Sequence, residues 1–553
     1  MDMRASTGLV VAGLLLGSPI ASLSAQSPLI LDRNRADRIQ PVTPTAPDTA
    51  RGAPAAPTSV IEDGTDESGT IIRAIRFVGM KAPEPAARAA EAFIGKPATR
   101  ATLQNIAAAI SGGYAKADVA LYSVLIPNQN VADGVLRVLL IEGTVERVIV
   151  TDRSSGRARR LVAAIARHLA GEQPLRKSTL QRYISLIQDV PGTKTDIDIV
   201  QGSKQGMVRV TLVVTDRKNE FATGFDNRAG TTYRGGAFTA RATLYHLLRG
   251  GDQTDINLAA STNFNNYRYA SLSHSTAIGS NGGRLSVSAG YLKTRPRNTP
   301  IRGDAQIVGV TYSYPLIRDY RRNLTVSAGI DGLNSDNAAF GQLIASERTR
   351  AARAALGYVE ATPKRTLAGG VTVSRGIDML GARVTSPLAD AEFTKLNARA
   401  SLDQAIGKRL IVRLRIAGQY SRDRLPAAER FAVGGDDYGR AFEIAVLSAD
   451  RGAAALAELA VKPLSSSKTF GATEVYGFAD AARLRILPRG PFAGGSFLPG
   501  GSFDLASAGG GIRLAYTSKA ALFLEAAKPI DRPYAGYPKD WRFSVGWKLS
   551  LRA

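Results

Sequence analysis

The chain has 553 residues, more than one ordinary domain needs, and 71 basic against 47 acidic residues give it a net charge of +24. It has no cysteine, which excludes disulfides, thiolate metal sites and cysteine nucleophiles, and its three histidines, His168, His246 and His274, show no metal-binding spacing. We therefore expect no metal and no cofactor. Because the sequence shows no constellation of a nucleophile with a base or of metal ligands, we also expect no enzymatic activity. The basic charge first suggests a nucleic acid or an anionic surface as partner.

Residues 1–25 have the layout of a secretory signal peptide. Arg4 precedes an apolar stretch at 9–16, and small residues follow up to Ala25. A membrane anchor is the alternative, but the apolar stretch is too short to span a bilayer. Since an exported chain leaves the compartment of the genome, we expect no nucleic acid partner.

Residues 26–40 are expected to form a short polar helix, and residues 41–70 a Pro-rich linker. Pro28 can open the helix and Pro41 can close it. Its mostly polar surface would suit a water-filled site, and a disordered tail is the alternative. Five prolines within residues 41–57 predict an extended segment with no fold of its own.

Residues 71–144 and 145–218 predict two small α+β modules in tandem, each in the order strand, helix, helix, strand, strand. Strands are expected at 72–78, 121–126, 135–141, 145–150, 195–200 and 207–214, and helices at 86–93, 103–114, 157–170 and 178–189. Each module would leave an edge strand open, and an open edge can accept an extended peptide. The alternative is that the modules are structural spacers.

Residues 219–553 predict a transmembrane barrel. In the last strand Phe543, Val545 and Trp547 alternate with Ser544 and Gly546, so one face suits lipid and the other suits water. Sixteen such strands are expected to begin near Phe221, Ala237, Asp255, Tyr267, Arg284, Ala305, Asn323, Arg350, Ala368, Phe393, Leu410, Ala454, Gly471, Gly510, Ala520 and Trp541. A soluble all-β protein is the alternative, which the export signal and the two tryptophans of the last strand disfavour.

The polar faces of these strands account for part of the basic charge. Six arginines alternate with apolar residues and are expected to face the lumen: Arg241, Arg284, Arg399, Arg413, Arg415 and Arg513. We therefore expect an occupant of the lumen that is anionic or screened by counterions.

The order of these parts resembles the outer-membrane transporters of two-partner secretion, the haemolysin secretion/activation type known as TpsB. The resemblance implies an all-β transmembrane barrel of 16 antiparallel strands, preceded by two small α+β POTRA domains, with residues 26–40 as a helix that plugs the pore. The POTRA motif is carried by Tyr114, Pro127, Gln129, Gly134 and Gly143 in the first module and by Arg182, Asp189, Pro191 and Gly192 in the second.

The segment FAVGGDDYGRAFE, residues 431–443, resembles the family's sixth extracellular loop, which folds back into the lumen. Its motif residues are Gly434, Gly435, Gly439, Arg440 and Phe442, and the glycines would allow tight turns. The family's partner motif on the barrel wall matches Phe478 and Asp480. By strand parity Asp480 faces the lumen, where we expect it to hold Arg440 in a charge-assisted pair.

Two features depart from the family pattern. Ala441 follows the loop arginine where a glycine is common, and the chain ends in Ala553 instead of an aromatic residue. Recognition by the barrel-assembly machinery is therefore expected to rely on Trp547 or Phe543.

The resemblance implies a pore in the outer membrane of a Gram-negative bacterium, in contact with outer-membrane lipid and with its POTRA domains in the periplasm. The pore would export a partner exoprotein that carries an N-terminal secretion domain, in two-partner (type Vb) secretion. The alternatives are an outer-membrane protein insertase of the same superfamily, which two modules instead of a longer array disfavour, and a plain porin or adhesin. The sequence shows no phosphate-binding loop that would point to ATP as the energy source.

Overall fold

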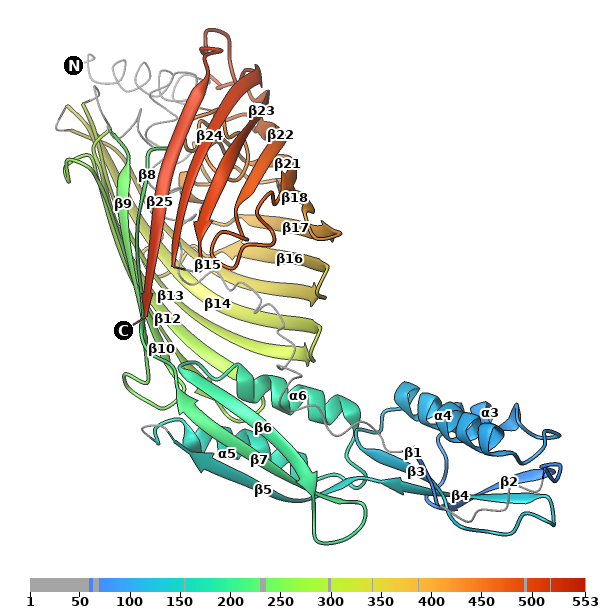
Figure 1. Ribbon diagram of the computed structural model, residues 1–553. Helices are drawn as coiled ribbons and strands as arrows, with labels where there is room; N and C mark the ends of the chain where they lie inside the picture. The colour runs from blue at the N-terminus through green and yellow to red at the C-terminus, as the bar shows by residue number, and fades with distance from the viewer. Residues whose placement is uncertain are drawn as a thin grey trace, which may run out of the picture.

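A computed structural model describes residues 59–62, 69–153, 156–228, 235–296, 300–340, 342–385, 387–491, 495–517 and 519–552. The predicted signal peptide and the predicted helix at 26–40 lie outside these residues. Figure 1 shows a barrel with two small modules that extend from one of its ends. Among the described residues, no helix is long and apolar enough to cross a membrane.

The first module packs two helices on one face of a small sheet. Its sheet has the order β1 (Ser59–Ile61), β3 (Tyr122–Ile126), β4 (Val135–Glu142), β2 (Ala74–Gly79), and its helices are α3 (Glu84–Glu91) and α4 (Arg100–Lys116). Helix α4 begins after Thr99, whose hydroxyl accepts the backbone N–H of Thr102. Leu103, Ile106 and Ile110 are fully buried against the sheet, as their spacing predicts.

Strand β1 corrects one expectation from the sequence. Its residues belong to the predicted linker, yet they pair in parallel with β3, from Ser59 opposite Val124 to Ile61 opposite Ile126. The chain itself therefore covers β3, and the edge strands of this sheet are β1 and β2. The pairing is stabilised where Ile61 packs against the core of the module, which linker composition does not reveal.

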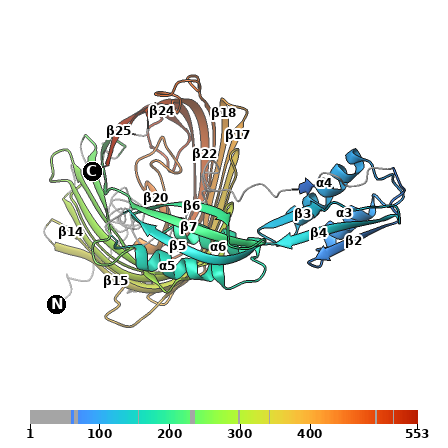
Figure 2. The same ribbon diagram turned by 60° about the horizontal axis from the view of Figure 1, so that its bottom comes forward.

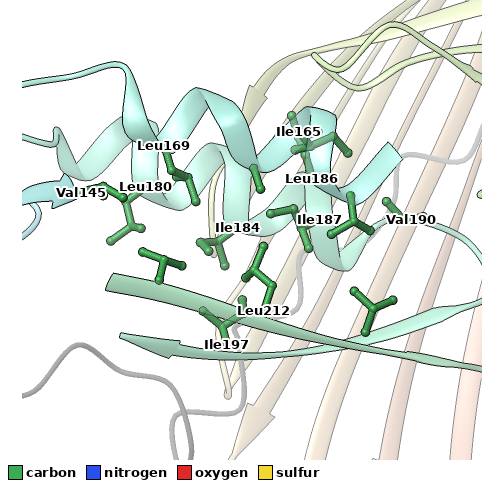
Figure 3. Packing of buried hydrophobic residues seen from close by; sticks show 14 of the residues in the cluster. Val145, Ile165, Leu169, Leu180, Ile184, Leu186, Ile187, Val190, Ile197 and Leu212 are labelled. Carbon is green, nitrogen blue, oxygen red and sulfur yellow. The ribbon is translucent and has the colours of Figure 1, made fainter. Parts of the chain in front are cut away.

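The second module repeats this arrangement without an added strand among the described residues. Its sheet has the order β5 (Thr144–Asp152), β7 (Met207–Asp216), β6 (Thr193–Gln201), and its helical segments are α5 (Arg159–Ala166), η1 (Arg167–Ala170) and α6 (Lys177–Gln188). Figure 3 shows Ile184 and Ile187 of α6 directed at Leu212 of the central strand. Strand β6 therefore remains an edge strand.

The described part of the third unit forms a closed barrel of sixteen antiparallel strands. The strands are β8 (Glu220–Asp226), β9 (Ala237–Tyr245), β10 (Gln253–Ser261), β11 (Tyr267–Ile278), β12 (Gly283–Thr294), β13 (Ile301–Arg318), β14 (Arg322–Ala339), β15 (Gln342–Ala361), β16 (Arg365–Gly376), β17 (Thr394–Ile406), β18 (Leu410–Ser421), β21 (Arg451–Val461), β22 (Glu474–Ile486), β23 (Gly501–Tyr516), β24 (Ala520–Asp531) and β25 (Arg542–Arg552). All sixteen predicted strands are present, and β25 closes the ring on β8.

Strand β22 shows how sequence parity separates the two faces of the barrel wall. Tyr476, Phe478 and Asp480 are buried, whereas the intervening Val475 and Ala479 are exposed. Because side chains alternate along a strand, the first set points into the lumen and the second points outward. The predicted inward direction of Asp480 is confirmed.

Candidate functional site: a loop anchored in the barrel lumen

A long connection, residues 422–450, joins β18 to β21 and folds into the barrel. It contains a 3₁₀ turn, η2 (Ala427–Glu429), and a short hairpin of β19 (Phe431–Val433) and β20 (Leu447–Ala449). Eleven barrel strands precede this loop and five follow it. We call residues 422–450 the lumen loop.

The glycines of the lumen loop adopt the left-handed backbone region that the sequence predicts. Gly434, Gly435 and Gly439 have φ of +111°, +96° and +77°. A Cβ atom on Gly434 would lie 2.1 Å from the carbonyl oxygen of Glu443, so a side chain at this position is sterically excluded. Phe442 is fully buried, with its ring centroid 5.4 Å from that of Tyr537.

Arg440 lies at the tip of the loop and contacts two lumen carboxylates. Its Nη1 is 3.0 Å from Oε2 of Glu458 on β21 and 3.3 Å from Oε2 of Glu525 on β24. The guanidinium also lies over the ring of Phe478, 4.5 Å from the centroid, and its Nε donates to the carbonyl of Asp436 at 3.1 Å. Only 6% of Arg440 is exposed, so the charge is both buried and paired.

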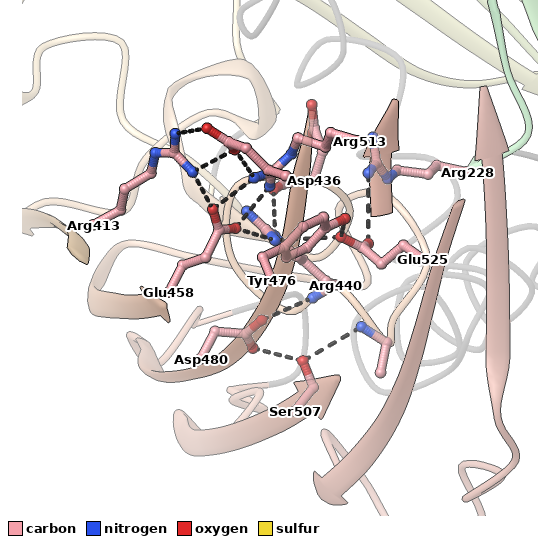
Figure 4. A network of polar contacts seen from close by, with 12 residues as sticks. Arg228, Arg413, Asp436, Arg440, Glu458, Tyr476, Asp480, Ser507, Arg513 and Glu525 are labelled. Carbon is pink, nitrogen blue, oxygen red and sulfur yellow. Dashed lines mark hydrogen bonds and ion pairs between the residues drawn. The ribbon is translucent and has the colours of Figure 1, made fainter. Parts of the chain in front are cut away.

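Asp480 contacts Arg440 through the backbone, and the predicted side-chain pair is therefore wrong. The backbone N–H of Arg440 donates to Oδ2 of Asp480 at 3.1 Å, and the hydroxyl of Ser507 donates to Oδ1 at 2.7 Å. The guanidinium instead points away, toward Glu458 and Glu525 (Figure 4). The carboxylate of Asp480 thus orders the loop backbone, and other acids balance the arginine.

Glu458 is the centre of an ion-pair network on the barrel wall (Figure 4). Its carboxylate accepts hydrogen bonds from Arg413 at 2.9 Å, from Arg513 at 2.7 Å and from Arg440. Arg413 and Arg513 also bind Glu474, at 2.7 and 3.2 Å. Two of the predicted lumen arginines are therefore matched by acids, and this part of the lumen is not a purely basic lining.

A cavity of about 350 Å³ lies beside this network. It is lined by Asp403, Arg413, Arg415, Leu456, Glu458, Glu474 and Arg513. Groups of both signs face the same space, which suits a hydrated path for a polar chain better than a site for one small anion.

Sequence reasoning missed the acids that hold Arg440. Glu458 shares its face of β21 with Leu456 and Ala460, and Glu525 is a buried acid in a mostly apolar strand. The same parity rule that placed the arginines in the lumen would have placed both glutamates there. Glu525 also accepts from the hydroxyl of Tyr476 at 2.8 Å.

The motif residues of the first module hold its own fold together. Tyr114 is buried and its hydroxyl donates to Oε1 of Glu142 at 3.0 Å. Gln129 exchanges two hydrogen bonds with the backbone of Arg137, at 2.7 and 2.8 Å, and also donates to the carbonyl of Pro127. The backbone N–H of Gly143 donates to the carbonyl of Leu121 at 2.7 Å, where a Cβ atom would clash.

The motif residues of the second module instead join it to the barrel. Asp189 forms a bidentate ion pair with Arg318 at the end of β13, with distances of 2.6 Å to Nε and 2.7 Å to Nη2. Arg182 of α6 donates to the carbonyls of Pro315 and Leu316 at 3.0 and 3.1 Å. Figure 1 shows α6 directly beneath the ends of the barrel strands.

The turn at Pro191 and Gly192 completes this joint. The carbonyl of Gly192 lies 3.0 Å from Nε2 of His246, in the turn between β9 and β10. Gly192 has φ of +72°, and a Cβ atom there would lie 2.4 Å from Cβ of Tyr245. The glycine is therefore required because the barrel packs directly on the turn. His246 serves this joint, and no group of three potential metal-ligating side chains occurs among the described residues.

Comparisons with known proteins agree with this architecture. Residues 206–507, more than half of the chain, match the family model described as haemolysin secretion/activation protein ShlB/FhaC/HecB, and residues 70–143 match the ShlB-type POTRA domain. The heme/hemopexin transporter protein HuxB of Haemophilus influenzae is 22% identical over 462 residues, 79% of each chain. The outer membrane transporter CdiB of Dickeya dadantii is 24% identical over 363 residues, 62% of this chain and 63% of that protein.

Solved structures show the same fold. CdiB from Escherichia coli superposes with a TM-score of 0.70 at 17% identity, covering 96% of this chain and 98% of that one. BamA from Haemophilus ducreyi, without POTRA domains 1–3, has a TM-score of 0.51 at 13% identity and covers 87% of this chain and 99% of that one.

Proposed function

Because the chain belongs to the ShlB/FhaC/HecB family of haemolysin secretion/activation proteins, it is an outer-membrane transporter of two-partner secretion, and we propose that its barrel lumen is the path of the exported partner protein. In this proposal the lumen loop closes the path and moves aside during export. The POTRA modules lie in the periplasm, where they meet the unfolded exoprotein first.

The single observation that carries this proposal is a lumen loop fixed inside a closed barrel by buried ion pairs. The loop, which Arg440 holds on Glu458 and Glu525, occupies the lumen and has to move before a chain can pass. The acids and arginines around the neighbouring cavity can solvate a polar backbone as it passes, and their mixed charge disfavours tight binding of any one segment. Passage without tight binding is what an export path requires.

Docking of the exoprotein is proposed at the free edge of the second module. Strand β6 is the edge of its sheet, and in both views of the structure it is the strand of that sheet nearest the mouth of the barrel (Figures 1 and 2). The pairing of β1 on β3 in the first module shows how such an edge accepts an extended segment in parallel. A segment added to β6 would lie next to the entrance of the pore.

The remaining parts of the proposal follow from the family and the exposed surface. The outward residues of the strands, such as Val308, Ile416 and Phe543, are apolar and exposed, so they would contact outer-membrane lipid. The barrel-assembly machinery would insert the barrel, with recognition at Trp547 or Phe543. Residues 26–40 are proposed to plug the lumen.

Removal of residues 72–214 tests this function. We expect the truncated barrel to assemble, shown by heat-modified mobility in the outer membrane, and to export none of a co-expressed partner protein. Export by the truncated protein would contradict a docking role for the modules. If removal of the whole protein lowered the levels of unrelated outer-membrane barrels, the insertase alternative would replace the export proposal.

A further inference from the structure

Glu429 in the lumen loop makes buried ion pairs with the barrel wall that are separate from those of Arg440. It ends the turn η2, and only 3% of it is exposed. Arg353 on β15 binds both of its carboxylate oxygens, at 2.6 and 3.1 Å, and Nζ of Lys395 on β17 lies 2.6 Å from Oε2. Glu429 therefore attaches the beginning of the loop to the β15–β17 part of the wall.

The backbone at Glu429 is held as firmly as its side chain. The carbonyl oxygen accepts hydrogen bonds from Nζ of Lys395 and from Nε2 of Gln419 on β18, both at 3.0 Å. Because the same residue binds through two different groups, a shift of the turn would break several contacts together.

The barrel wall positions these partners for Glu429. Arg353 is fixed from its other side by Asp331 on β14, with Nε 2.5 Å from Oδ2, and it donates to the hydroxyl of Ser374 at 2.9 Å. Arg353 and Lys395 carry two positive charges, and Asp331 and Glu429 carry two negative ones. Without Glu429 this buried cluster would keep one uncompensated positive charge.

The wall contacts of Glu429 and Arg440 occupy two successive arcs of the barrel. Glu429 is held by Arg353 on β15, Lys395 on β17 and Gln419 on β18. Arg440 is held by Glu458 on β21 and Glu525 on β24, and β21 pairs with β18. The two ends of this stretch of the loop are therefore fixed on different strands.

We propose that Glu429 is a second anchor of the lumen loop, which fixes the beginning of the loop on β15–β18 independently of the anchor of Arg440 on β21 and β24. Each anchor keeps its own end of the loop in place when the other is lost. The inference rests on the proposed export function in one respect only, which is that the export path opens fully when both anchors release.

The absence of cysteine in the chain permits a direct test with single reporter thiols. Ala428 and Ala441 are 3% and 4% exposed and lie beside the two anchors. Ala428→Cys reports the Glu429 end and Ala441→Cys reports the Arg440 end. In the assembled full-length protein, both thiols should react slowly with a membrane-impermeant maleimide added from outside.

Glu429→Gln should increase the labelling rate of the thiol at 428 severalfold and leave that at 441 unchanged. Arg440→Ala should increase the labelling rate of the thiol at 441 severalfold and leave that at 428 unchanged. Glu392→Gln is the matched control, since it removes an exposed ion pair with Arg375, 3.1 Å long, from the same region of the barrel. It should change neither rate. Exposure of both thiols by Arg440→Ala alone would show a single anchor and overturn the proposal, as would an unchanged rate at 428 in Glu429→Gln.

A charge-balanced variant separates loss of the anchor from poor assembly. Glu429→Gln with Lys395→Gln removes one charge of each sign and leaves Arg353 on Asp331. Its barrel should show wild-type heat-modified mobility, and its thiol at 428 should still label rapidly. Slow labelling in this assembled variant would also overturn the second anchor.

Channel conductance measures the consequence for the pore. In planar bilayers, Glu429→Gln combined with Arg440→Ala should conduct more than either single variant. Equal conductance of the double variant and Arg440→Ala would contradict two independent anchors. These measurements need no exoprotein. A wild-type protein that exports nothing would therefore contradict the proposed function and leave the two-anchor result intact.

Discussion

Asp189 of the second module and Arg318 of the barrel form a bidentate ion pair in which the arginine side chain is only 2% exposed. Removal of one partner from a buried pair leaves an uncompensated charge, which costs about 3 kcal/mol. The pair therefore fixes the orientation of the module, and with it the position of β6, relative to the entrance of the pore.

Asp189→Ala should loosen this joint and reduce export, while the barrel still assembles. The expected measurement is faster cleavage by trypsin between module and barrel, together with lower export. The charge swap of Asp189→Arg with Arg318→Asp should restore part of the trypsin resistance and part of the export. Asp196→Asn, which removes an exposed pair with Lys194 in the same module, is the control and should behave as wild type. Wild-type trypsin resistance in Asp189→Ala would exclude a fastening role.

Arg440→Ala should cut export without blocking assembly, because Glu458 retains Arg413 and Arg513 as partners. Asp480→Ala should also reduce export, since it leaves the backbone N–H of Arg440 unpaired at a cost of about 1–3 kcal/mol. Asp480→Asn keeps an oxygen acceptor and should be milder.

The swap of Arg440→Asp with Asp480→Arg should not restore export, because the carboxylates that bind the guanidinium are Glu458 and Glu525. Export by each variant is measured against the amount of heat-modifiable barrel. Recovery of export by the swap would mean that the two side chains pair directly during function.

Gly434→Ala should disable the lumen loop. The new Cβ atom would lie 2.1 Å from the carbonyl oxygen of Glu443, at a φ of +111°. Gly407→Ala is the control, because Gly407 also has a positive φ, +65°, but has no atom within 4 Å of its Cβ position. The control should cost only about 1–2 kcal/mol of backbone strain. Equal export by the two variants would show that the loop tolerates a side chain at its tip.

Tyr114 should make the first module sensitive to alkaline pH. Burial raises the pKa of the Tyr114 hydroxyl above its usual value, and the neighbouring Glu142 carboxylate adds to the shift. The unfolded chain then releases this proton first as pH rises beyond about 10, so stability is full below that pH and falls above it.

Tyr114→Phe should flatten this decline and lower stability at neutral pH by about 1 kcal/mol through loss of the hydrogen bond to Glu142. Protease resistance of the first module in the intact protein, measured between pH 8 and pH 11, checks both effects. Burial also raises the pKa of Tyr122, so a smaller decline of stability with rising pH should remain in the variant. An unchanged decline in Tyr114→Phe would show that another group causes the pH dependence.

Strand parity predicted the membrane part of the barrel well, but it could not find the ends of the longest strands. Strand β15 was expected near Arg350 and begins at Gln342, and β23 was expected near Gly510 and begins at Gly501. In the outer part of β15, Ser346 and Glu347 pair with Asp336 and Ser335 of β14. Lipid imposes alternation only within the membrane, and beyond it a strand continues because its neighbour does.

In the candidate site, too, the sequence predicts some features and not others. Local sequence determined the glycine turns and the inward direction of Asp480, because both depend on neighbours within a few residues. The partners of Arg440 could not be predicted, since Glu458 and Glu525 lie 18 and 85 residues away and their approach depends on barrel curvature. Asp189 and Arg318, 129 residues apart, belong to different folding units, and no local pattern links them.

Closure of the ring by β25 on β8 sets the order in which the barrel can form. Glu220 pairs with Arg552 and Asp226 pairs with Gly546. The first barrel strand can therefore complete its pairing only with residues near the other end of the chain. Until then β8 and β24 both present unpaired backbone groups, which hydrocarbon does not tolerate. Loss of the last strand should therefore leave β8 without its partner and prevent the barrel from closing in the membrane.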